Sequence, residues 1–265
     1  MKKSLFYSLS AIFFLLPGVL LMLKSVTPVW KWGEAFSFTF TLRGWETFLM
    51  DDRIFHALFL SILIALAATF INLAIGMISG KALSHQNFKG KSLIETLLLL
   101  PLFLPVMAAA LGLHITMIRL GLANTWFGVV LVHLVPTVPY TIKVMKAGYD
   151  RLGGGMLEQA QMLGAKPLYI FRTVELPLLM PSIRSAVFLT VTISMSQYVL
   201  TAVIGGGSVI TLPIIYYPFL QSVDDTVMAA FSTAFALLPI IAVGAVEIVS
   251  KLIRANGLVL NRGVK

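Results

Sequence analysis

Apolar residues recur along this chain in six long runs, separated by short stretches that carry most of its charges, glycines and prolines. A helix needs about 20 apolar residues to cross a bilayer, and each run is long enough. The pattern therefore predicts an all-α polytopic membrane protein with one transmembrane domain over residues 1–265. The six predicted spans are residues 5–23, 54–80, 93–118, 125–147, 181–204 and 227–250.

The first run follows Lys2 and Lys3, so a cleaved signal peptide is the competing interpretation. Its apolar stretch is long for a signal, and no small-x-small cleavage site follows before Lys24. We therefore expect an uncleaved first span. After it, residues 25–52 contain Trp30, Trp32 and Trp45, which we expect at the outer membrane interface.

Composition agrees with a membrane protein and excludes several other classes. Apolar residues make up 58% of the chain, charged residues only 12%, and the mean hydropathy is +0.92, whereas a soluble domain is about a quarter charged. The net charge of +9 does not indicate a nucleic-acid partner, because the basic residues form no stripe. The four histidines lack ligand spacing and cysteine is absent, so no metal or redox site is predicted.

The basic residues predict the orientation. With the N-terminus inside, fifteen of the twenty lysines and arginines fall in inner segments. The outer ones are Lys24, Lys31, Arg43, Arg53 and Arg119. The positive-inside rule then places both termini in the cytoplasm, together with the loop between spans four and five, residues 148–180.

In that loop, glycines and prolines stand at positions that predict two short helices. Gly153–Gly155 allow a flexible exit from span four. A helix is expected over Met156–Leu163, with Glu158 in its first turn and Gly164 as a left-handed stop.

A second short helix is expected to begin at Pro167 and to end near Leu176, Pro177 and Pro181. Such a helix pair can dock into a groove of a partner protein, or it can merely anchor the loop at the membrane surface. The residues alone leave both alternatives open.

The same loop resembles the E-A-A-x-x-x-G-x9-I-x-L-P signature of the inner-membrane permeases of type I ABC importers. The similarity extends over about residues 54–250, and the spacing holds at every position. The matching residues are Glu158, Gln159 (in place of alanine), Ala160, Gly164, Val174 (in place of isoleucine), Leu176 and Pro177. A second stretch, residues 205–225, resembles the outer loop of the polyamine, ferric iron and thiamine branch of these permeases.

The resemblance implies a permease of a bacterial-type inner membrane that is not itself an enzyme. It would supply half of a dimeric pore, pairing with an identical or homologous permease. The loop would be the coupling helix that inserts into a cytoplasmic ABC ATPase dimer, so ATP and Mg²⁺ would bind there and this chain would need no cofactor. An extracytoplasmic solute-binding protein would deliver the small solute.

Two other classes remain as alternatives. A secondary transporter or channel would work without an ATPase, but the acidic residues are expected in loops or near helix ends, and no inverted repeat is evident. A membrane scaffold would need no polar path through its helices.

A polar path is nevertheless suggested by the fifth predicted span. Ser194, Gln197 and Thr201 are separated by three, four and seven residues, which places them on one side of a continuous helix. Asn72 in the second span is likewise costly to bury. These four residues are the candidate translocation path, and packing between helices is the alternative role.

Overall fold

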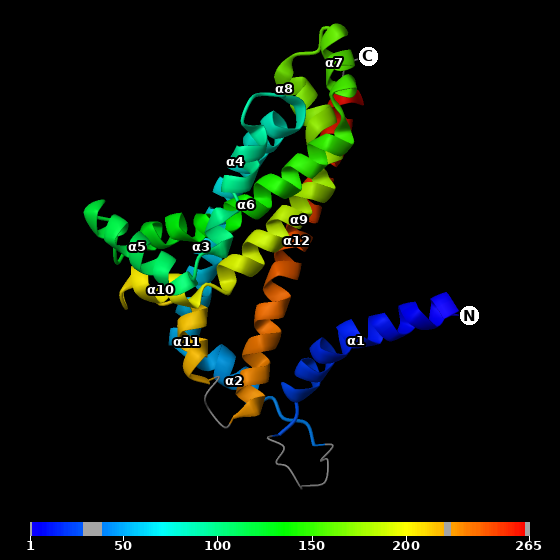
Figure 1. The fold of residues 1–265 in the computed structure, drawn as a ribbon. Helices are drawn as coiled ribbons and strands as arrows, with labels where there is room; N and C mark the ends of the chain where they lie inside the picture. Colours follow the sequence, from blue (N-terminus) through cyan, green and yellow to red (C-terminus); the bar gives the residue numbers. More distant parts are fainter. Residues whose placement is uncertain (1, 29–38, 220–223, 263–265) are drawn as a thin grey trace. The chain divides into compact units, whose positions relative to one another are not determined.

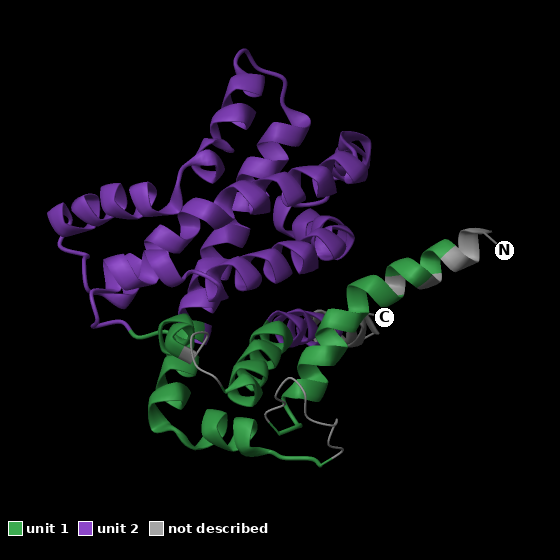
Figure 2. Cartoon of the chain, turned by 60° about the horizontal axis from the view of Figure 1, so that its bottom comes forward, with its two compact units in different colours: residues 1–61, 210–238 green, residues 62–209, 239–265 purple. Residues whose placement is uncertain are grey.

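The computed structural model describes residues 2–28, 39–219 and 224–262, and every regular element within these ranges is a helix (Figure 1). The predicted all-α class is therefore confirmed. The chain forms two compact units (Figure 2): unit 1 comprises residues 1–61 and 210–238, and unit 2 comprises residues 62–209 and 239–265. Two long helices contribute to both units, α3 (Asp52–His85) and α12 (Asp225–Arg262).

Unit 1 has an aromatic core. Besides the first parts of α3 and α12, its helices are α1 (Lys2–Lys24), α2 (Arg43–Met50) and α11 (Leu212–Phe219). The ring of Phe48 meets that of Phe231 edge-on, with centroids 5.0 Å apart, and Tyr216 stacks on Phe231 at 5.4 Å. Each such pair adds about 0.5–1.5 kcal/mol to the burial of apolar area. The three rings join α2, α11 and α12.

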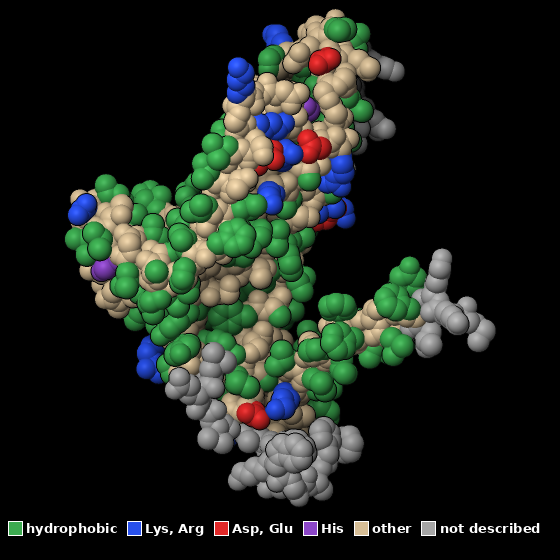
Figure 3. Space-filling view, in the orientation of Figure 1, with side chains coloured by type: hydrophobic (Ala, Val, Ile, Leu, Met, Phe, Trp, Pro, Cys, Tyr) green, Lys and Arg blue, Asp and Glu red, His purple; other side chains and the backbone are tan. Residues whose placement is uncertain are grey.

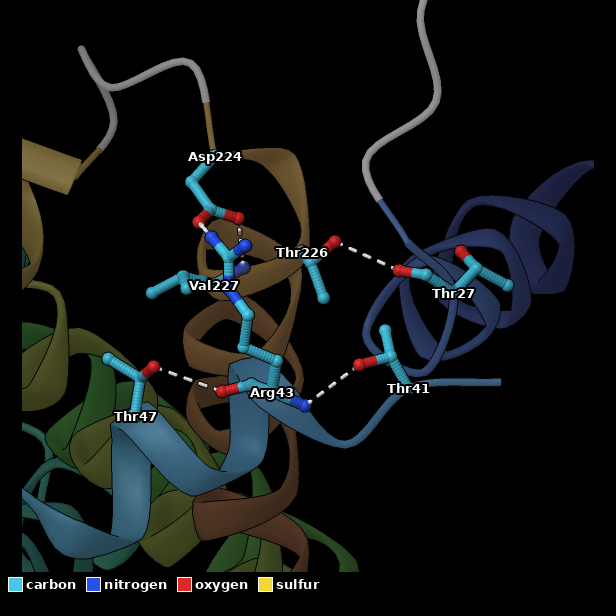
Figure 4. A network of polar contacts seen from close by, with 7 residues as sticks. All are labelled: Thr27, Thr41, Arg43, Thr47, Asp224, Thr226 and Val227. Atoms are coloured by element: carbon cyan, nitrogen blue, oxygen red, sulfur yellow. Dashed lines mark hydrogen bonds and ion pairs between the residues drawn. The ribbon is translucent and has the colours of Figure 1, made fainter. Parts of the chain in front are cut away.

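Polar contacts hold the start of α12 within unit 1 (Figure 4). Asp224 precedes the helix, and its carboxylate accepts a hydrogen bond from the Val227 backbone N–H at 3.3 Å, which caps the first turn. The same carboxylate pairs with the guanidinium of Arg43 in α2. The Thr226 hydroxyl donates to the Thr27 carbonyl, just after α1, at 2.9 Å. Three segments that are distant in sequence are thereby joined.

The predicted first span coincides with α1, but the apolar stretch identified there, Ile12–Lys24, is shorter than a full membrane crossing. That α1 crosses a membrane stays a prediction. Of the three tryptophans expected at the outer interface, Trp30 and Trp32 lie outside the described residues. Trp45 lies half-buried in α2, and its indole N–H donates to the Ser25 hydroxyl at 3.1 Å.

Unit 2 is centred on two long helical segments that pack along each other. Its elements after α3 are α4 (Lys91–Leu97), η1 (Leu100–Phe103), α5 (Val106–Arg119), α6 (Trp126–Leu152), α7 (Gly154–Met162), α8 (Pro167–Ile170), the π-helical η2 (Phe171–Glu175), α9 (Leu176–Met195) and α10 (Tyr198–Gly205). Met145 of α6 and Leu179 of α9 are fully buried between them. The short helices α7 and α8 lie together at one end of this unit, away from α5 and α10 (Figure 1).

Glycines bring the helices of unit 2 unusually close. A Cβ atom at Gly80 of α3 would lie 2.8 Å from the backbone nitrogen of Lys146 in α6. One at Gly148 of α6 would lie 2.5 Å from the Ser182 Oγ of α9. Small residues at such interfaces let helix backbones approach, which is how membrane helices gain packing energy. Together, α3, α6 and α9 form a tightly packed set.

Four helical segments in the described chain are long and apolar enough to cross a membrane: Asp52–His85, Trp126–Leu152, Pro167–Met195 and Asp225–Val249. They coincide with the second, fourth, fifth and sixth predicted spans, although several bounds differ.

The third predicted span, residues 93–118, is not one straight helix. Lys91–Phe103 and Val106–Arg119 meet at an angle of 102°. Between them Leu104 is extended, with φ −77° and ψ 138°, because Pro105 disfavours a helical conformation for the residue before it. The two segments make a fifth span only if the bent pair is counted as one.

The bounds predicted for the fifth span, residues 181–204, are wrong at both ends. The helical path begins earlier, at Pro167, and does not stop at Leu176 and Pro177 as predicted. A π turn precedes the proline, with the Leu176 N–H bonded to the Phe171 carbonyl, and the chain continues as helix. At the other end α9 stops at Met195, and α10 begins only at Tyr198.

Candidate functional site

The loop between α6 and α9, residues 153–175, forms a helical, glycine-bounded projection, called the knob below. Gly153, with φ 70°, ends α6, and α7 follows at once. Gly164 has φ 77°, so the predicted left-handed stop is confirmed. Pro167 lies at the start of α8, also as predicted. Glu158 is not in the first turn, because α7 begins at Gly154 rather than at residue 156.

The knob is anchored by one apolar side chain and exposes others. Leu157 is buried, at 6% exposure, whereas Met162 and Leu163 are 85% and 87% exposed. Of the motif residues in α7, Glu158 and Gln159 are exposed and Ala160 is half-buried. Charged side chains gather over the end of unit 2 that carries α4, α7 and α8, and hydrophobic ones cover the surface around α5 and α10 (Figure 3). Exposed apolar side chains therefore project from the most polar end of this unit.

The knob is joined to the helices by an ionic cluster around a buried carboxylate, which sequence analysis missed. Glu175, the last residue of η2, is only 4% exposed. Its Oε1 lies 2.6 Å from the Lys81 ammonium of α3, and its Oε2 accepts a hydrogen bond from the Tyr149 hydroxyl of α6 at 3.1 Å. From the sequence, this carboxylate was expected near a helix end, with nothing to indicate its burial.

Further polar contacts surround the base of the knob. The Arg151 guanidinium donates to the Ser182 hydroxyl at 2.9 Å, which ties α6 to α9. The Ser84 hydroxyl of α3 donates to Asp150 of α6 at 2.6 Å. The end of the α3–α6–α9 set next to the knob is thus cross-linked by polar as well as apolar contacts.

A second polar cluster lies inside the same three helices. The Asn72 amide of α3 donates to the Thr137 hydroxyl of α6 at 2.8 Å, and this hydroxyl donates to the His133 carbonyl at 2.7 Å. The His133 ring contacts two further hydroxyls, with Nδ1 2.9 Å from Ser194 Oγ and Nε2 2.9 Å from Thr201 Oγ1. Ser194 lies at the end of α9 and Thr201 within α10, so His133 bridges the break between these helices.

The hydrogen bonds also assign the imidazole tautomer. Thr201 uses its hydroxyl proton on the Gln197 carbonyl, at 2.6 Å. Thr201 must therefore accept from His133, which places the imidazole proton on Nε2 and leaves Nδ1 to accept from Ser194. Both ring nitrogens are satisfied in a side chain that is only 2% exposed.

Ser194, Gln197 and Thr201, the three candidate path residues of the fifth predicted span, do not line one helical face. The prediction required a continuous helix through residues 194–201, and this helix is interrupted at Ser196 and Gln197. Asn72, Ser194 and Thr201 are buried and bonded to neighbouring helices, whereas Gln197 is half-buried at the break. The structure thus brings Ser194 and Thr201 together, because both bond to the His133 ring. The Gln197 side chain does not take part in these two hydrogen bonds.

No cluster in the described part of the chain is arranged to hold a metal ion through three or more histidine, aspartate or glutamate side chains.

Residues 72–255 match the family model described as the binding-protein-dependent transport system inner membrane component. The chain belongs to this family. It is 27% identical over 216 residues to the spermidine/putrescine transport system permease protein PotC of Escherichia coli K12, covering 80% of each chain. It is 28% identical over 205 residues to the putative 2-aminoethylphosphonate transport system permease protein PhnV of Salmonella typhimurium LT2, covering 77% of this chain and 76% of PhnV.

Solved structures share the fold. A bacterial ABC transporter that imports the acidic polysaccharide alginate aligns with a TM-score of 0.64 and 17% identity, covering 96% of this chain and 94% of that one. A second structure, the alginate transporter in complex with its pentasaccharide-bound periplasmic protein, aligns with a TM-score of 0.63 and 14% identity, covering 95% and 96%. The match to the family model confirms the predicted permease family. This permease is an all-helical, multi-pass inner-membrane protein and the transport component of its system.

Proposed function

We propose that this permease forms half of the solute path of an ATP-driven importer, and that α7 is the helix that docks on a cytoplasmic ABC ATPase. The observation that carries the proposal is the exposure of Met162 and Leu163 at the polar end of unit 2. Apolar side chains among charges are typical of a surface that a protein partner covers. The match of Glu158, Ala160, Gly164, Leu176 and Pro177 to the importer motif supports the same role.

The proposed assembly contains two permeases, two ATPase subunits and an extracytoplasmic binding protein. Six spans per chain, with α1 as the first and the bent α4–α5 segment as the third, supply half of a pore, and an identical or homologous permease supplies the other half. ATP and Mg²⁺ bind to the ATPase. The alginate transporter solved with its periplasmic protein supports delivery of cargo by such a protein.

Both termini and α7 are proposed to be cytoplasmic, because fifteen of the twenty basic residues then lie inside. The chain has no cysteine, so single cysteines at Ser84, Gly154 and Ser208 provide a direct test. A membrane-impermeant thiol reagent should label only Ser208→Cys in intact cells. Labelling of Gly154→Cys from outside would contradict both the orientation and the docking role of α7.

The proposed cargo is a polyamine or a related small amine. The curated relatives PotC and PotI are named as permeases for spermidine and putrescine or for putrescine, and PhnV is putatively assigned to 2-aminoethylphosphonate. All of these solutes carry an amino group. In such a system the binding protein sets most of the selectivity, and the permease supplies a gated passage.

Of the candidate path residues, we retain Gln197 as the one that faces the solute. It lies at the α9–α10 break, immediately before the first residue of α10. Unwound backbone at membrane depth is tolerated where it lines a cavity or is buried in protein. Asn72, Ser194 and Thr201 are assigned instead to packing between helices.

A gradient-driven transporter is the competing class, and one observation favours it. Glu175 is a buried carboxylate, and buried ionisable groups in membrane proteins often serve proton or ion coupling. Its pairing with Lys81 argues for a structural role instead. Proteoliposomes containing the permease, its ATPase and its binding protein separate the two classes. Uptake of spermidine or putrescine should require ATP and should persist without an ion gradient; uptake driven by a gradient alone would contradict the proposal.

A further inference from the structure

Glu175 connects the knob to two transmembrane helices at once. One carboxylate oxygen contacts the Lys81 ammonium of α3 at 2.6 Å, and the other accepts from the Tyr149 hydroxyl of α6 at 3.1 Å. Lys81 also lies over the Tyr149 ring, 6.0 Å from its centroid. Charge-assisted hydrogen bonds are about twice as strong as neutral ones, so this contact resists separation.

Both partners of Glu175 are fixed by close helix packing. Lys81 follows Gly80 directly, and Tyr149 follows Gly148. A Cβ at Gly80 would lie 2.8 Å from a backbone nitrogen of α6, and one at Gly148 would lie 3.0 Å from Leu179 Cδ2 of α9. Helices in such intimate contact shift together, because packed interfaces do not deform gradually. A force applied to Glu175 is therefore delivered to α3 and α6 as a pair.

The packing beside this contact is incomplete. A cavity of about 250 Å³ lies between the knob and α3, and Gln161 of α7, Pro167 of α8 and Met77 of α3 are among the residues that line it. The ionic contact of Glu175 with Lys81 at the cavity edge therefore joins the knob to α3 where the packing between them is interrupted.

The backbone that presents Glu175 is itself unusual. Residues Phe171–Glu175 form a π turn, a rare arrangement that is enriched at functional sites. The turn ends two residues before Pro177, which has no N–H to donate to the helix. The π turn therefore sets the rotation about the helix axis with which α8 continues into α9.

We propose that Glu175 is a positioning residue that transmits movement of the knob to α3 and α6 through its ionic contact with Lys81. This inference rests on the proposed function, in which the ATPase moves α7. It predicts a specific defect: without the contact, the knob still follows the ATPase, but less of its movement reaches α3.

Glu175→Gln is the most informative variant. The amide keeps the size of the side chain and can still accept from Tyr149. The unpaired Lys81 is tolerated because its side chain is 45% exposed and can be hydrated. Lys81→Met should destabilise the protein more, since it leaves a buried carboxylate without its cation. Glu95→Gln is the matched control, because it removes a carboxylate from another lysine pair, with Lys146 at 3.4 Å, which joins α4 to α6 and includes no residue of the knob.

The test is hydrogen–deuterium exchange on the full permease–ATPase complex, with and without nucleotide trapped on the ATPase by vanadate. In the parent complex, trapping should change exchange both in residues 154–166 and in α3. In Glu175→Gln most of the α3 change should be lost, while the change in residues 154–166 remains. Glu95→Gln should respond like the parent.

The reversed pair Lys81→Glu/Glu175→Lys should regain part of the α3 response, and it provides a second test if Glu175→Gln does not assemble. An α3 response equal to the parent's in Glu175→Gln, or in Lys81→Met, would overturn the inference and leave the docking proposal intact. If trapping changes nothing in residues 154–166 of the parent, the docking proposal itself fails, and this inference fails with it.

Discussion

His133 of α6 and Thr201 of α10 are joined by a 2.9 Å hydrogen bond from Nε2 to Oγ1, across the break that separates α9 from α10. On the other side of the break, the same ring accepts from Ser194. One side chain thereby fixes the relative positions of two helical segments that the backbone alone would leave adjustable.

Replacing this histidine should destabilise the protein. His133→Ala leaves the Ser194 hydroxyl without its imidazole acceptor and opens a buried space, at a cost of about 1–3 kcal/mol. In detergent, the midpoint of thermal unfolding should fall by about 5 °C. His56→Ala, which removes an exposed histidine, is the control and should leave the midpoint unchanged. Equal midpoints for the two variants would mean that the bridge contributes little to stability.

The close contact of α6 with α9 predicts a second packing defect. In Gly148→Ala the new methyl group would lie 2.5 Å from Ser182 Oγ, the atom that accepts from Arg151. Overpacking of this kind costs about 1–3 kcal/mol. Gly112→Ala in α5 is the matched control, because its methyl group meets no atom within 4 Å. Thermal unfolding should separate the two variants; a Gly148→Ala protein as stable as Gly112→Ala would contradict the packing described.

The left-handed turn at Gly164 gives a test of the knob's shape. Gly164→Val strains a position with φ 77°, whereas Gly164→Asn fits it better, since asparagine tolerates this conformation. We expect both proteins to insert normally. The valine variant should retain less ATPase on purification and lose ATP-driven uptake, and the asparagine variant should keep most of both. Full uptake with valine would show that the knob's shape is not needed for coupling.

If Gln197 faces the solute, replacing it should reduce transport without affecting assembly. Gln197→Leu removes the amide proposed to face the solute, so uptake in proteoliposomes should fall while ATPase subunits remain bound. Thr192→Val is the control, because Thr192 is exposed on α9 and bonds only locally, to the Phe188 carbonyl at 2.7 Å. Parental uptake by Gln197→Leu would identify Gln197 as another packing residue.

Local signals predicted much of this structure. The left-handed stop at Gly164 and the helix start at Pro167 follow from the backbone preferences of glycine and proline, and both were predicted correctly. The 102° bend at Leu104 and Pro105 has a similar local cause, but the apolar run around it concealed the break.

The remaining features depend on contacts between distant residues. The break at Ser196 and Gln197 contains neither glycine nor proline, and His133 lies more than 60 residues away in sequence. The burial of Glu175 likewise depends on Lys81, which is 94 residues away. No periodicity in the chain reports either pairing, so the sequence led to a continuous fifth helix and to an unremarkable loop carboxylate.

Photo-cross-linking at the tip of the knob tests the docking proposal most directly. A benzophenone amino acid in place of Leu163, which is 87% exposed, would probe the proposed ATPase contact, and one in place of Leu111 of α5, 54% exposed, would serve as the control. On irradiation of membranes that contain the whole transporter, the probe at position 163 should form an adduct with the ATPase subunit, and the probe at position 111 should not. Absence of an ATPase adduct at position 163, in membranes that retain the ATPase and import solute, would contradict docking through α7.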